Sequence, residues 1–137
     1  MPWQVTDHTA DMALRIEAST EAALFEEAAR ALTSLFVDDP ATIEPREEFG
    51  FELRAADRDD LLFDWLQTLV VAFELRHMLL RCFRVTLEAG GLHASAQGER
   101  FDPARHRLAH EVKAITYHGL AIRASHDGWR AEVIVDV

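Results

Sequence analysis

Hydrophobic residues follow two different spacings along the chain, and these spacings predict strands and helices in a definite order. Apolar and polar residues alternate over residues 12–18 and again over 49–55, which is the pattern of a half-buried strand. Apolar residues recur at helical spacing from residue 24 to Val37 and from Leu62 to Phe73. Helix caps support both helices, because Ser19 or Thr20 precedes the first and Asp57 precedes the second.

The second half of the chain has the alternation and turn signals of β-structure. Residues 83–87 and 92–96 flank Gly90-Gly91, which predicts a hairpin. Polar residues 99–110 predict a loop, residues 112–124 a strand bent at Gly119, and residues 129–137 a last strand. The order β-α-β-α followed by several strands predicts one α+β domain over residues 1–137. Its two helices would pack on a mostly antiparallel or mixed sheet.

Composition favours a soluble cytoplasmic protein. The 137 residues are 49% hydrophobic and 28% charged, which suits one globular domain. No apolar run approaches the roughly 20 residues of a membrane span, and residues 1–4 have no signal-peptide pattern. The single Cys82 cannot form a disulfide framework, so we expect a reducing compartment and no membrane partner.

The charge balance argues against a protein that grips RNA by itself. The net charge is −10, with 24 acidic residues against 14 basic ones, and Lys113 is the only lysine. Stand-alone RNA binding normally relies on clustered basic residues that neutralise phosphates. We therefore expect no stable direct nucleic-acid binding and favour a cation or a basic protein surface as the partner.

Two aspartates are candidate metal ligands at opposite ends of the sequence. Asp11 stands just before the first predicted strand, and Asp136 lies in the last one. If these strands are neighbours, the carboxylates come together, and calcium and magnesium favour such oxygen ligands. A terminal oxygen of Val137 would add to the set. The alternative is that Asp136 is simply exposed on an edge strand.

A second concentration of polar residues lies in the segment 111–118. On a strand, Glu111 and Lys113 would project from one face and Thr116 and His118 from the other. The lone lysine of an arginine-rich chain suggests that its identity matters. The alternative is an exposed charge near the edge of a sheet.

No complete catalytic constellation is present, so we predict that the protein is not an enzyme. His106 and His110 have the i, i+4 spacing of zinc ligands on a helix, but Pro103 indicates a loop and no HExxH pattern accompanies them. The chain also lacks a phosphate-binding glycine loop and a nucleophile elbow. A zinc hydrolase is therefore rejected.

Three segments of the chain form a specific combination, and they are His8-Thr9-Ala10-Asp11, Glu111-Val112-Lys113-Ala114-Ile115-Thr116-Tyr117-His118 and Asp136-Val137. Together they resemble the archease family, and the resemblance covers essentially the whole chain. The predicted helices, with Asp57 and Leu61-Leu62, match the family as well.

The resemblance implies an accessory protein of the RtcB-type RNA ligase, which joins RNA ends in transfer-RNA splicing and RNA repair. Such a protein promotes guanylylation and repeated turnover of the ligase and does not join RNA itself. The implied metal site consists of the Asp11 and Asp136 carboxylates and a main-chain oxygen of Val137, with calcium as the suggested ion.

The resemblance also assigns expectations to four other residues. Glu111 and Lys113 are the candidates for contacts that assist ligase activation, whereas His8 and His118 would order the local structure. Two alternatives stay open beside the accessory factor. One is a chaperone-like module that modulates proteins or RNAs without a dedicated ligase. The other is a small metal-dependent hydrolase, which the missing base and nucleophile disfavour.

Overall fold

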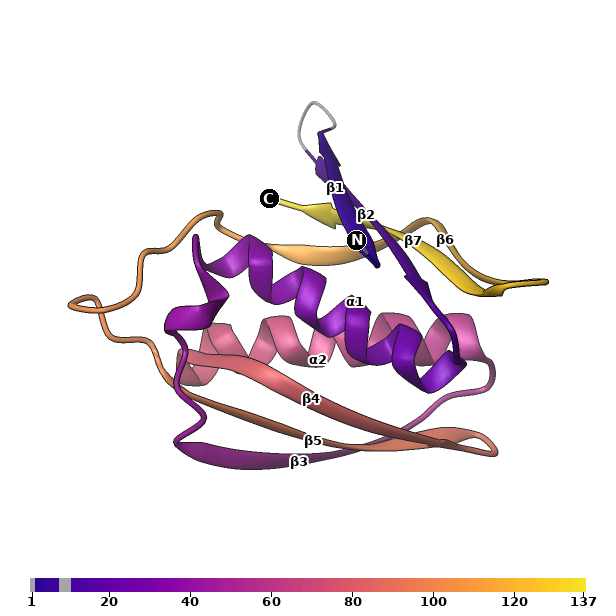
Figure 1. The fold of residues 1–137 in the computed structure, drawn as a ribbon, viewed down its shortest axis with the longest axis horizontal. Helices are drawn as coiled ribbons and strands as arrows, with labels where there is room; N and C mark the ends of the chain where they lie inside the picture. Colours follow the sequence, from indigo (N-terminus) through magenta and orange to yellow (C-terminus); the bar gives the residue numbers. More distant parts are fainter. Residues whose placement is uncertain (1, 8–10) are drawn as a thin grey trace.

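Two helices lie between two antiparallel sheets in the computed structural model, which describes residues 2–7 and 11–137 (Figure 1). One sheet has four strands in the order β1-β2-β7-β6 and the other has three in the order β3-β5-β4. The helices are α1 (Glu21–Phe36) and α2 (Arg58–Arg76), and a short 3-10 helix covers Pro40–Thr42. The strands are β1 (Trp3–Asp7), β2 (Asp11–Ala18), β3 (Glu47–Arg54), β4 (Met78–Glu88), β5 (Gly91–Arg100), β6 (Ala114–Ser125) and β7 (Gly128–Asp136).

Local signals at the helix ends agree with the predictions. The Thr20 side chain accepts a hydrogen bond from the Ala23 N–H at 3.1 Å and begins α1. The Asp57 carboxylate accepts one from the Asp60 N–H at 2.8 Å and begins α2. These bonds satisfy backbone donors that the first helical turn leaves free.

The two helices are buried to different extents. Helix α1 packs against strands of both sheets, and its buried positions extend as far as Phe36. Helix α2 buries Trp65 completely, and the indole N–H donates to the Phe25 carbonyl oxygen at 3.1 Å. The last fully buried residue of α2 is Val70, and beyond it Phe73 still packs against the core whereas Leu75 is exposed.

The four-stranded sheet joins the two ends of the described chain. Strand β2 pairs antiparallel with β7, and in this register Asp11 stands opposite Asp136. On its other side β7 pairs with β6, where Ala114 is the partner of Asp136. The first long strand and the last strand are therefore neighbours in the middle of one sheet.

The predicted α+β class and the order of the main elements are confirmed, but some boundaries differ. Strand β1 was not predicted, although Trp3 and Val5 alternate with polar residues. Strand β5 continues to Arg100 where a loop was expected from residue 99. The sequence also did not separate the strands into two sheets.

Strand β6 has the bend that was expected at Gly119, but it starts at Ala114 and not at Val112. Its register with β7 shifts between Thr116 and Ala121, and Gly119 has a φ of 69° that favours glycine. None of the helices described is long and apolar enough to cross a membrane.

Candidate functional site

Asp11 and Asp136 lie directly opposite each other on the neighbouring strands β2 and β7. Opposite residues of an antiparallel pair project from the same face, with Cβ atoms about 4.5–5.5 Å apart. Both residues are partly buried. The structure thus brings together two carboxylates that are far apart in the sequence.

No basic side chain compensates this pair of carboxylates within the described residues. None of the ion pairs formed there, with a nitrogen within 4.0 Å of a carboxylate oxygen, involves Asp11 or Asp136. Like charges directly opposite each other destabilise a sheet. Two neighbouring carboxylates without a cation are therefore a chemically suitable start for a divalent-ion site.

Side chains alone do not complete such a site. Among the side chains that the structure describes, in residues 2–5 and 11–137, no group of three or more His, Cys, Asp or Glu residues is arranged to hold a metal. Calcium takes six to eight oxygen ligands, and main-chain carbonyls and waters commonly supply several. Val137 directly follows Asp136, so its main-chain oxygen fits this need.

Lys113 is connected to the carboxylate pair through the backbone. Its N–H donates to the Asp136 carbonyl oxygen at 2.8 Å. Val112 is buried, whereas Glu111 and Lys113 on either side of it are exposed. The prediction of a strand at residues 111–113 is wrong, because β6 starts at Ala114. The two charged side chains are nevertheless both accessible beside the end of β7.

A hollow of about 460 Å³ lies between this segment and the end of α2. Its apolar lining includes Phe73 and Leu108, and its charged lining includes Glu74, Glu111 and Lys113. Leu108 is 47% exposed, although it is a large hydrophobic residue. The hollow therefore offers mixed apolar and charged contacts next to Lys113.

Backbone hydrogen bonds attach the segment before Lys113 to the end of α1. The N–H groups of Ala109 and His110 donate to the carbonyl oxygens of Phe36 and Leu35 at 2.9 and 3.0 Å. The last carbonyls of a helix have no partners within the helix. The segment caps α1, and α1 in turn fixes the backbone that leads to Lys113.

A buried carboxylate holds the other end of the same segment. Glu99 is only 4% exposed and pairs with Arg105. Its Oε2 accepts from the Glu44 N–H at 2.7 Å and lies 3.0 Å from the Nε2 of His106. The Asp102 N–H donates to the His106 Nδ1 at 2.9 Å, so Nε2 carries the proton donated to Glu99.

The surroundings of Glu99 favour its charged form. Burial raises the pKa of this carboxyl, but hydrogen bonds from Arg105, the Glu44 N–H and His106 outweigh burial. The pKa falls from its ordinary value of 4.5 to about 2. Glu99 is thus an ionised structural anchor. Its position at the start of a polar stretch predicted a loop and no role for Glu99, because its partners give no local signal.

The predicted histidines do not gather around the carboxylate pair. His8 lies outside the described residues. His118 is exposed in the irregular part of β6, where its N–H donates to the Thr116 hydroxyl at 3.3 Å. Of the pair considered as zinc ligands, His106 is bound within the Glu99 cluster and His110 is exposed.

Tyr117 forms a contact that the sequence did not predict. Its ring stacks on Phe63 of α2 with the ring centroids 3.8 Å apart. Burial raises the pKa of Tyr117, and the charges of Asp60 and Asp64 raise it further. This stack joins the irregular part of β6 to α2.

Comparisons with known proteins agree with this architecture. Residues 3–137 match the Archease protein family (MTH1598/TM1083). The chain is 40% identical to the protein archease of Methanopyrus kandleri, with all of both chains covered, and 34% identical to that of Pyrococcus furiosus, with 98% of each covered.

Two solved structures have the same fold. The solution structure of protein 1598 from Methanobacterium thermoautotrophicum superimposes with a TM-score of 0.86, at 30% identity and with 99% of both chains covered. The crystal structure of an archease from Thermotoga maritima, described as a possible chaperone, gives a TM-score of 0.70 at 23% identity, with 98% and 96% covered. From its matching family profile and its full-length relatives, this chain belongs to the archease family.

Proposed function

We propose that this protein is an accessory factor that activates an RtcB-type RNA ligase by promoting its guanylylation and repeated turnover. Its setting would be transfer-RNA splicing and RNA repair. The observation that supports this role most strongly is the pairing of Asp11 with Asp136, which form no ion pair with a basic residue in the part of the chain that the structure describes. A divalent cation, with calcium as our choice, would be held by these carboxylates and a main-chain oxygen of Val137.

The residues around the carboxylate pair suit work on a phosphate-containing partner. A bound cation supplies positive charge that carboxylates alone cannot offer to phosphate oxygens. Lys113 adds an exposed ammonium group, which donates hydrogen bonds to phosphates. Glu111 adds an exposed carboxylate that can accept from a donor of the ligase.

The overall charge supports action through a protein partner. With a net charge of −10 the chain repels the RNA backbone, so RNA is better held by the ligase. The hollow lined by Phe73, Leu108 and Lys113 offers the partner a mixed apolar and charged surface. In this proposal the chain assists guanylate transfer and leaves the chemistry to the ligase.

The test is guanylylation of the purified ligase from the same organism. The ligase is incubated with GTP and manganese, with and without substoichiometric amounts of this protein. We expect stimulation by the wild type and its loss in Asp11→Asn, Asp136→Asn and Lys113→Ala. Glu132→Gln is the matched control, because Glu132 also lies on β7 but forms a surface pair with Arg15 at 3.1 Å.

The variants separate the parts of the proposal. Folded aspartate variants that stimulate as well as the control would show that the carboxylate pair has no part in activation. If the wild type does not stimulate guanylylation with any nucleotide or divalent ion, the ligase is ruled out as the partner. In that case the chaperone-like module is the next hypothesis, and prevention of aggregation of unrelated unfolded proteins tests it.

A further inference from the structure

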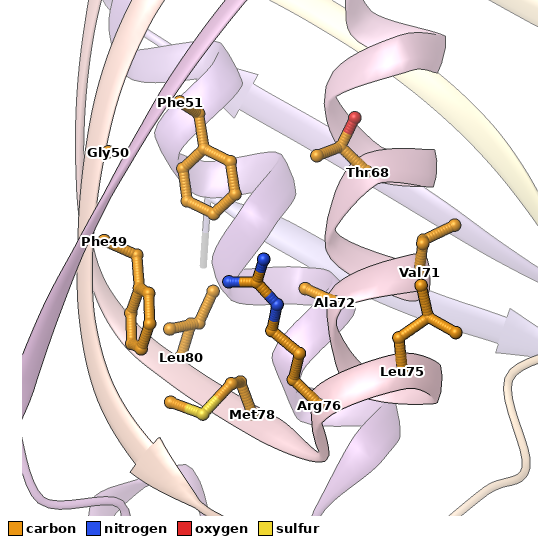
Figure 2. Close-up of a pocket in the computed structure, with 10 residues that line it drawn as sticks. All are labelled: Phe49, Gly50, Phe51, Thr68, Val71, Ala72, Leu75, Arg76, Met78 and Leu80. Atoms are coloured by element: carbon orange, nitrogen blue, oxygen red, sulfur yellow. The ribbon is translucent and has the colours of Figure 1, made fainter.

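A second hollow, of about 300 Å³, opens between the exposed end of α2 and the three-stranded sheet (Figure 2). Phe49 and Phe51 of β3 form one wall, Val71 and Leu75 of α2 lie on the other, and Met78 of β4 also lines it. None of the residues proposed for the metal or for ligase activation lines it. We call it the α2–β3 groove.

Within the described part of the chain, the apolar walls of this groove are only partly covered. The buried residues of α2 end at Val70, and Leu75 remains 76% exposed in the next turn. Val71 is 36% exposed, and Phe49 and Phe51 are partly buried. Large hydrophobic side chains gathered around one concave surface are typical of a binding site.

Among the residues that the structure describes, Arg76 is the only charged one that lines the groove. It extends from α2 toward Phe49 and Phe51 in Figure 2. Within the described part of the chain it forms none of the ion pairs or side-chain hydrogen bonds found for eight other arginines, which are Arg15, Arg30, Arg46, Arg54, Arg58, Arg81, Arg105 and Arg130. A guanidinium group beside apolar walls favours a carboxylate, which it can bind through two parallel hydrogen bonds.

Strand β3 supplies a third element of recognition. It is the edge of its sheet and pairs only with β5 among the described strands. The free edge of a strand presents backbone N–H and C=O groups to which an extended peptide can add. Along β3 the partly buried residues Phe49, Phe51 and Leu53 alternate with exposed ones. An added strand would therefore direct every second side chain toward the groove.

We propose that the α2–β3 groove binds an extended peptide segment of a partner protein. The segment adds to β3 as a further strand, places apolar side chains against Phe49, Phe51 and Leu75, and directs one carboxylate to Arg76. The apolar and acidic residues that face the groove therefore lie at every second position of the segment. This site is separate from the proposed ligase activation and does not depend on it.

Other occupants fit the groove less well. A second copy paired through its own β3 would bring the Glu47 carboxylate to this face, because Glu47 alternates in step with Phe49 and Phe51. It would also set two strands side by side that each carry three glutamates against one arginine, and these like charges repel. RNA would meet a single cation in a chain of net charge −10, whereas RNA surfaces use several.

The test begins with selection of phage-displayed random octapeptides on the full-length protein. We expect enriched peptides with two apolar residues and one Asp or Glu spaced two positions apart. The dissociation constants of fluorescein-labelled enriched peptides are then measured by fluorescence polarisation. Arg76→Glu should weaken binding about tenfold or more, because it replaces a charge-assisted pair with repulsion. Exchanging the acidic residue of the peptide for Lys should restore binding to Arg76→Glu.

Two further variants complete the design. Arg84→Glu is the matched control, since Arg84 is exposed on the opposite face of the same sheet and should leave the affinity unchanged. Leu75→Ser tests the apolar wall at a largely exposed position that folding does not require, and we expect about fivefold weaker binding.

Three results would overturn the proposal. One is the absence of any enriched motif, and another is equal affinity of the peptides for Arg76→Glu and Arg84→Glu. The third is occupation of the groove by another ligand. That ligand would be a second copy if sedimentation velocity shows a dimer that excludes the peptides, or RNA if labelled decauridylate binds in a way that depends on Arg76.

Discussion

Glu99 is a buried carboxylate and Asp11 and Asp136 are partly buried ones, and the surroundings of the two sites differ. Glu99 is enclosed by Arg105, His106 and the Glu44 N–H, which together satisfy both of its oxygens. Asp11 and Asp136 face each other without a basic partner in the described structure. The arrangement around Glu99 stabilises the fold, but it leaves the carboxylate inaccessible to a ligand. The arrangement of Asp11 and Asp136 leaves negative charge free for a ligand, and this difference separates a structural carboxylate from a candidate functional one.

The largest effect is expected from removing the compensated carboxylate. Glu99→Ala leaves the buried His106 ring and the Glu44 N–H without their acceptor, and breaking a buried ionic cluster costs about 3–5 kcal/mol. Urea denaturation should show this loss in the free energy of unfolding. Glu132→Ala, which removes an exposed pair with Arg15, should cost at most about 1 kcal/mol. Equal losses in the two variants would contradict the structural role of Glu99.

Acid should weaken the same cluster over a defined range of pH. The pKa of Glu99 is about 2 in the folded chain and 4.5 ordinarily, so the unfolded state takes up its proton first as the pH falls. The stabilisation from Glu99 is present above pH 4.5 and decreases as the pH falls toward about 2. Unfolding followed between pH 6 and 2 should show a steeper loss for wild type than for Glu99→Gln. Parallel curves would mean that Glu99 is not selectively stabilised in its charged form.

A divalent cation should stabilise the uncompensated pair. With calcium at about 100 times its dissociation constant, binding to the folded state alone adds about 2.7 kcal/mol. Urea denaturation in calcium, compared with EDTA, should show this gain for wild type and for Glu132→Gln. Asp136→Asn should abolish it. A gain that persists in Asp136→Asn would place the ion elsewhere.

The smallest effect has the opposite sign from that of Glu99. Without metal, Asp11→Asn removes one of two like charges on opposite strands, so the free energy of unfolding should rise by about 0.2–1 kcal/mol. Glu74→Gln, at an exposed position of α2, controls for the change in net charge. A rise in stability limited to Asp11→Asn supports local repulsion, whereas an equal rise in both variants indicates a general effect of charge.

The elements that could be predicted from the sequence are those with local signals. Thr20 and Asp57 each cap a helix through a residue three positions away, and Gly90-Gly91 joins two strands that are adjacent in sequence. The Glu99 cluster could not be predicted in this way. Its polar residues are typical of an exposed loop, and only the folded chain places Glu44 beside them. Strand β1 did have a local signal, the alternation from Trp3 to Thr6, although it was not predicted.

The candidate site could be predicted only in part, for a related reason. Asp11 and Asp136 were identified as residues, but their opposition depends on β2 and β7 being neighbours, and pairing between distant strands has no local signal. The start of β6 at Ala114 was also missed. Residues 109 and 110 use their N–H groups to cap α1 and not to pair with a strand, a choice that the alternation of side chains cannot reveal.

The capping of α1 by Ala109 and His110 also has a consequence for the order of folding. The hydrogen bonds to Phe36 and Leu35 join parts of the chain that are distant in sequence, and closing a long loop costs entropy before the contact forms. We therefore expect the amide protons of residues 109 and 110 to become protected late in refolding, after those in the middle of α1. Lys113 would reach its place beside Asp136 only at that stage. The surface proposed to meet the ligase would then be among the last parts of the molecule to form.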